Sequence, residues 1–77
     1  MIVIYTQEKT YIRQDAAAAL PVLKKVYGEI LGKEAYRTVN KARIGMSYQK
    51  NGGPLVKVVS ETDAMWIKEK ETEIGML

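Results

Sequence analysis

The segment Ser47–Val59, SYQKNGGPLVKVV, decides the sheet of this protein, because it has the pattern of two strands joined by a tight turn. Apolar side chains alternate with polar ones on both sides of the turn, at Ile44, Met46, Tyr48, Val56 and Val58. This period of two is typical of half-buried antiparallel strands. A shift of one residue in the pairing would move every side chain to the other face, so the pattern also selects the loop length.

A three-residue loop, Asn51-Gly52-Gly53, pairs Tyr48 with Val56 and keeps the apolar side chains together on one face. Loops of this length favour a glycine in the left-handed conformation, and we expect Gly53 to adopt it. Pro54 fits beside the loop, because proline cannot donate a hydrogen bond inside a ladder. The sequence therefore predicts a hairpin with this register.

Upstream of the hairpin, the apolar start of the chain, MIVIY, predicts a strand covered on both faces. Asp15 is placed to cap a helix whose apolar residues recur at steps of three and four up to Leu31. Pro21 leaves two alternatives, a helix that bends near residue 20 or a helix that begins at Pro21. Gly32 is the expected stop, and residues 33–42 follow as a short second helix. The segment at Tyr11 is either a short strand or a docked connection.

The segment after the hairpin, residues 64–69, has two interpretations. Its alternation favours a third strand after a turn at Thr62-Asp63, which would place Trp66 on the outer face of the sheet beside Lys57. The motif SETD, which begins at Ser60, instead resembles the capping box of a helix. We favour the strand.

These elements predict an α+β fold: an N-terminal strand, one or two helices, and a three-stranded antiparallel meander with the helices on one face of the sheet. We expect a single small domain at 1–69 and an acidic C-terminal tail at 70–77. The predicted core consists of Ile2, Ile4, Leu20, Leu23, Tyr27, Ile30, Val39, Ile44, Met46, Tyr48, Val56, Val58, Met65 and Ile67.

Composition argues against several classes of function. The 77 residues include no cysteine and no histidine, which excludes disulfides and the usual zinc sites. No phosphate-binding glycine motif is present, and no acid, base and nucleophile are paired at a recognisable spacing. We expect no cofactor, no metal and no catalysis. The longest apolar run is too short to span a bilayer, so we expect no membrane and a cytoplasmic location.

Charge is distributed unevenly along the chain. Residues 1–60 hold ten Lys/Arg and four Asp/Glu, whereas residues 61–77 hold two and five. A basic body with an acidic tail has two interpretations, a surface that binds nucleic acid or an ordinary solvated surface. In the predicted register, the outer sheet face and the hairpin tip carry the residues that we expect to bind a partner: Arg43, Lys50, Asn51, Lys57, Trp66 and Lys68.

Three interpretations of Trp66 follow from that register. Its ring is core, or it belongs to a surface that pairs with a second copy or another protein, or it stacks on a nucleotide while the cations hold phosphates. We favour a non-catalytic nucleic-acid-binding module, such as an accessory protein of a phage or mobile element. A homo-oligomeric or protein-interaction module that uses the same face is the alternative.

One enzymatic alternative rests on architecture. A strand, a helix pair and an antiparallel meander with cationic strands resemble the small ribosome-dependent RNase toxins of the RelE type. That resemblance implies metal-independent cleavage of RNA by Arg, Lys and Tyr side chains. The matching residue types in this chain are Arg43, Tyr48, Lys57 and Lys68.

Overall fold

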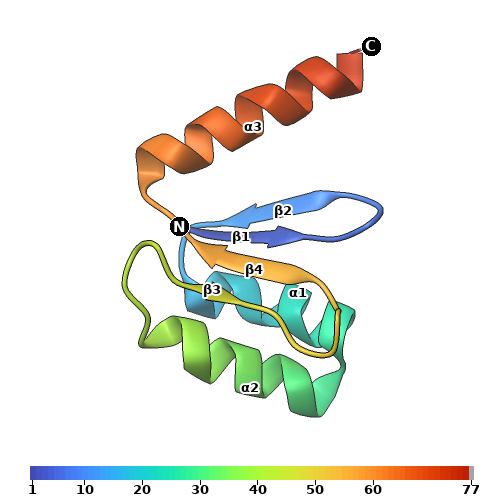
Figure 1. Ribbon diagram of the computed structural model, residues 1–77, viewed down its shortest axis with the longest axis vertical. Coiled ribbons are helices and arrows are strands. Elements are labelled where there is room, and N and C mark those ends of the chain that lie inside the picture. The colour runs from blue at the N-terminus through green and yellow to red at the C-terminus, as the bar shows by residue number, and fades with distance from the viewer. Residues whose placement is uncertain (77) are drawn as a thin grey trace.

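A computed structural model describes the backbone of residues 1–76 and the side chains of residues 1–68. Within that part the chain has an α+β fold with three helices and a four-stranded antiparallel sheet (Figure 1). In chain order the elements are β1 (Ile2–Tyr5), β2 (Thr10–Arg13), α1 (Ala16–Tyr27), α2 (Glu29–Asn40), β3 (Ser47–Tyr48), β4 (Leu55–Val58) and α3 (Glu61–Met76).

The sheet differs from the predicted meander. Its strand order is β2-β1-β4-β3, so an N-terminal and a C-terminal hairpin meet where β1 pairs with β4. The helix pair α1 and α2 packs against the strands, and α3 lies beyond β2, at the other end of the strand order from β3 (Figure 1). The α+β class is confirmed, but the number and arrangement of the strands differ from the prediction, and α3 is a helix outside the predicted pair.

The C-terminal hairpin has the predicted register, with Tyr48 opposite Val56. The left-handed positions, however, are Asn51 and Gly52 (φ 55° and 69°) rather than Gly53. Positive φ at both central residues is the pattern of a type I′ turn, which favours Asn-Gly. A Cβ at Gly53 would be crowded, at 3.1 Å from the Lys50 carbonyl oxygen and 3.3 Å from the Tyr27 ring.

The hairpin tip packs against the end of α1. The hydroxyl of Tyr27 donates a hydrogen bond to the carbonyl of Pro54. The Tyr27 and Tyr48 rings meet edge to face, with centroids 5.8 Å apart. Burial, followed by the neighbouring Tyr48, raises the pKa of Tyr27. This contact fixes the C-terminal hairpin on the helix pair.

The helix pair begins as predicted and divides at a different glycine. The Asp15 side chain accepts a hydrogen bond of 2.8 Å from the backbone N–H of Ala18, as expected of an N-cap. The helix runs through Pro21 and ends before Gly28, whose φ of 91° makes the turn into α2. Gly32, the predicted stop, lies inside α2, where a Cβ would come within 2.6 Å of the Lys24 Cα. Gly32 therefore allows the two helix backbones to approach closely.

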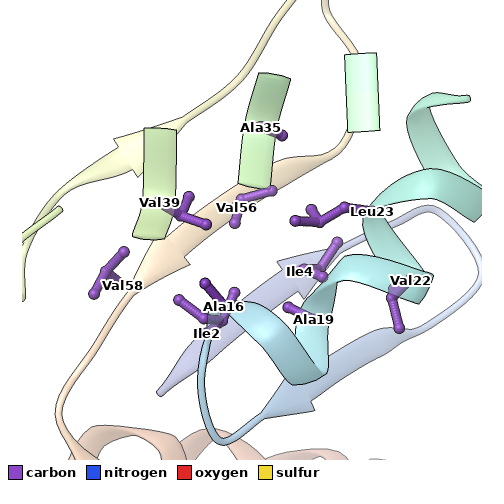
Figure 2. Packing of buried hydrophobic residues seen from close by; sticks show 10 residues of the cluster. All are labelled: Ile2, Ile4, Ala16, Ala19, Val22, Leu23, Ala35, Val39, Val56 and Val58. Carbon is purple, nitrogen blue, oxygen red and sulfur yellow. The ribbon is translucent and has the colours of Figure 1, made fainter. Parts of the chain in front are cut away.

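The core lies between the helix pair and strands β1 and β4 (Figure 2). Predicted members such as Leu23 are fully buried, but three alanines that the prediction omitted, Ala16, Ala19 and Ala35, are buried among them. Small side chains fit there because the helices are close to each other and to the sheet. Predicted core residues that are exposed instead are Ile30, Ile44, Met46 and Met65.

The favoured strand at 64–69 is wrong, because this segment belongs to α3. The Ser60 hydroxyl accepts a hydrogen bond from the backbone N–H of Asp63 at 3.1 Å, and acidic residues occupy the first turn. Both features stabilise a helix N-terminus. The predicted tail at 70–77 begins inside this helix, and its side chains lie outside the described residues.

Candidate nucleic-acid interface

One edge of the molecule is built from a stretch of chain without acidic residues. Residues 35–60 contain five Lys/Arg and no Asp/Glu. They form most of α2, the loop after it, and the hairpin of β3 and β4. β3 is the edge strand of the sheet and contacts α2, so α2, the loop after it and the hairpin are neighbours along this edge (Figure 1).

Four of the five cations are exposed and form no ion pair with any residue of the described part of the chain. We name this set the basic edge: Arg37, Lys41, Arg43 and Lys57. The fifth, Lys50, donates a hydrogen bond of 2.7 Å to the Glu34 carboxylate. That bond raises the pKa of Lys50 and offsets its charge. The basic edge is thus the part of this stretch that is free to attract an anion.

A rigid turn projects from the basic edge. The backbone N–H of Met46 donates to the carbonyl of Arg43 at 3.1 Å, which closes a turn with Gly45 at φ 103°. Gly45 donates to the Val58 carbonyl at 2.8 Å, and Val58 donates back to Met46 at 2.9 Å. Gly45 and Met46 thus both oppose Val58, which is the arrangement of a glycine β-bulge. The bulge explains why Ile44 and Met46 are not core residues: the regular strand begins only at Ser47.

The structure separates the predicted site residues into three places. Arg43 and Lys57 belong to the basic edge, where Arg43 precedes β3 and Lys57 is on β4 opposite Ser47. Lys50 and Asn51 lie at the hairpin tip, next to α1 and α2, where the Asn51 backbone serves the turn. The remaining two, Trp66 and Lys68, are on α3, which packs against β2, the opposite edge of the sheet.

Trp66 is 61% exposed, so its interpretation as a core residue is wrong. The outer sheet face on which it was expected is also less open than predicted. Val3 on that face is fully buried, and Ala64 at the start of α3 is buried as well. Lys57 remains an exposed side chain on this face. The predicted arrangement of an indole beside Lys57 on a strand is therefore not formed.

The residue set suggested by the RNase resemblance is also dispersed. The Tyr48 side chain packs against the core, and its hydroxyl is buried without a hydrogen-bond partner in the described residues. Lys68 is on α3, while Arg43 precedes β3. Tyr48 consequently cannot contact a bound RNA in this conformation.

Two open grooves lie outside the basic edge. The larger, of about 600 Å³, separates the two hairpin tips and is lined by Tyr5, Tyr11 and Lys25, among others. Lys9 lies 4.6 Å from the centre of the Tyr11 ring and occupies one of its cation-binding positions. The second, of about 510 Å³, lies between β2 and the first turns of α3. Both walls mix charges, with Glu8 and Lys25 in the first groove and Glu61, Arg13 and Lys68 in the second, whereas the basic edge holds cations alone.

The described residues include no cluster of three or more acidic groups that could hold a metal ion. None of the helices, as far as the structure describes them, is both long and apolar enough to cross a membrane. No family model, curated protein or solved structure matches this chain. The function must therefore be argued from the surface itself.

Proposed function

We propose that the protein is a non-catalytic module that binds nucleic acid through the basic edge. The observation that carries this proposal is the set of four exposed cations without ion pairs in an acid-free stretch of 26 residues, 35–60. Exposed cations can neutralise the phosphates of a nucleic acid without an enclosed pocket, since its backbone is a regular array of negative charge. Binding of a nucleic acid to the basic edge would need no cofactor or metal.

The number of cations sets the expected salt dependence. Each neutralised phosphate of a duplex contributes about −0.9 to the slope of log K against log salt concentration. If all four side chains of the basic edge contact phosphates, the slope is about −3.6, and the affinity falls about 150-fold between 50 and 200 mM salt. A neutral or apolar interaction would show almost no such dependence.

The test is a fluorescence-anisotropy titration of a labelled mixed-sequence duplex across that salt range. The double substitution Arg43→Gln with Lys57→Gln should reduce the slope by about 1.8, because two phosphate contacts are lost. The matched control, Lys24→Gln with Lys33→Gln, removes the same charge from two lysines that pair with Glu29. Equal losses in the two variants would show that only net charge matters, and would refute the assignment to the basic edge.

A second candidate function, self-association, is favoured by α3. Met65 and Trp66 are adjacent and exposed, and Ala64 is the only buried side chain among residues 61–68. An apolar pair on a helix that packs this little favours a protein partner. Residues 61–77 are acidic and residues 1–60 are basic. The acidic segment of one copy could therefore attract the basic part of a second copy, so the partner that we propose for α3 is a second copy of the chain.

Emission from Trp66, the only indole, tests this candidate by dilution. A dimer through α3 should give a blue-shifted maximum at high protein concentration that moves to the red on dilution. Trp66→Ala should then sediment as a monomer, whereas Ile30→Ala, at another exposed apolar side chain, should behave as wild type. A red maximum at every concentration would exclude self-association through this helix.

A further inference from the structure

An exposed isoleucine stands at the tip of the turn that projects from the basic edge. Ile44 is 67% exposed, although isoleucine is among the residues most often buried in folded proteins. Arg43 precedes it directly, and the other cations of the basic edge lie on α2, at the C-cap of α2 and on β4. We propose that Ile44 is an apolar wedge that enters the minor groove of duplex DNA while the basic edge holds the flanking phosphates.

The turn is built to hold this side chain in place. Three backbone hydrogen bonds fix residues 43–46, one across the turn and two to Val58 of β4. Gly45 provides the left-handed residue that the turn requires, and open space surrounds it. A β-branched side chain such as Ile44 has little rotamer freedom to lose on binding. The exposure of Ile44 is thus a property of an anchored turn rather than of a loose loop.

The surroundings of the turn favour a duplex over a single strand. Proteins that bind single strands stack bases on exposed aromatic rings. On the basic edge, within the described residues, the aromatic rings are Tyr36 and Tyr48, and both pack against the core. Trp66 is on α3, which contacts β2 at the far edge of the sheet from β3. Cations around one apolar tip instead match the proteins that insert an aliphatic side chain between base pairs and bend the duplex.

This inference rests on the proposed function, and it predicts which duplexes bind best. Inserting a side chain costs the stacking energy of one base step, and pyrimidine–purine steps such as TA are the easiest to unstack. A duplex with a central TA step should therefore bind more tightly than one with a central A-tract of equal length. The preference would arise without any hydrogen bond to a base.

The experiment uses 20-base-pair duplexes labelled at both ends, so that energy transfer reports bending while anisotropy reports binding. The wild-type protein should bend the TA duplex and bind it in preference to the single strand. Ile44→Thr preserves the β-branched shape but removes apolar surface, and should weaken binding about tenfold and abolish bending. The salt slope should not change, because no cation is removed.

Ile30→Thr is the matched control, since Ile30 is 82% exposed at the other end of α2 and outside the basic edge. It should bind and bend the duplex as the wild type does. Wild-type-like bending by Ile44→Thr, or equal affinity for the single strand, would overturn the wedge while leaving the proposed function in place. Failure of the wild-type protein to bind any duplex would overturn both.

Discussion

Gly32→Ala tests the close packing of α1 against α2. A Cβ at this position would lie 2.6 Å from the Lys24 Cα and 2.8 Å from the Leu23 carbonyl oxygen. These are backbone atoms of the facing helix, which cannot rotate away, so the helices must separate by more than half an ångström to reach ordinary contact. Overpacking of this kind costs about 1–3 kcal/mol, and the rigid neighbours place Gly32→Ala near the upper end.

Helix propensity acts in the opposite direction. Replacing glycine with alanine inside a helix stabilises it by about 1 kcal/mol. The net expectation is a loss of about 2 kcal/mol in the free energy of unfolding, measured by urea denaturation with far-ultraviolet circular dichroism. Lys33→Ala, one residue further along α2 at an exposed position, should change the stability by less than about 0.5 kcal/mol. A stabilised Gly32→Ala variant would refute the close approach of the two helices.

Three further predictions concern single contacts, each measured by urea denaturation. Asp15→Ala removes the side-chain cap on the N–H of Ala18 and should cost about 1 kcal/mol, and an unchanged stability would contradict the cap. Tyr27→Phe removes the hydrogen bond to Pro54 and should cost about 1 kcal/mol at neutral pH. The folded protein raises the pKa of Tyr27, so the wild type should lose stability as the pH rises above about 10, the ordinary tyrosine value. Tyr27→Phe should lack this loss of stability at high pH. Parallel curves of stability against pH for the variant and the wild type would contradict the assignment to Tyr27. Gly45→Ala, at φ 103°, should cost about 1–2 kcal/mol through backbone strain, whereas a neutral effect would mean that the turn is not held in this conformation.

The hairpin could be predicted from the sequence because its alternation leaves one register that keeps apolar side chains on one face. The exception is the end of that alternation. Ile44 and Met46 continue the period of two in the sequence, but they lie in the bulge at Gly45, before the regular strand begins at Ser47. A glycine inside an alternating pattern was the available signal, since it often marks a bulge.

The third strand was assigned to the wrong segment because short apolar runs fit either period. Residues 64–68, AMWIK, alternate no better than residues 10–13, TYIR, which form β2 beside β1. The Ser60 cap was visible in the sequence and correctly indicated a helix. The edge position beside β1 is instead occupied by residues 10–13, through backbone pairing that the sequence pattern does not reveal. The core was harder to predict, because the close approach at Gly32 makes alanines such as Ala19 and Ala35 the best-fitting residues.

The candidate site was predictable in its composition and not in its geometry. Arg43 and Lys57 could be selected as cations near the hairpin, and both are on the basic edge. Lys50 could not be separated from them, since its partner Glu34 is 16 residues away in the sequence. The signal that would have found the basic edge is the lack of acidic residues between positions 35 and 60.

The most direct test of the basic edge is a map of amide chemical shifts in ¹⁵N-labelled protein during titration with the TA duplex. The shifts should change most at Arg43, Gly45, Ser47 and Lys57, and they should return toward the free values at high salt. Amides of Gly52 at the hairpin tip and the indole N–H of Trp66 on α3 should remain nearly unchanged. The largest changes at α3, or in the groove between the hairpin tips, would contradict the assignment of nucleic-acid binding to the basic edge.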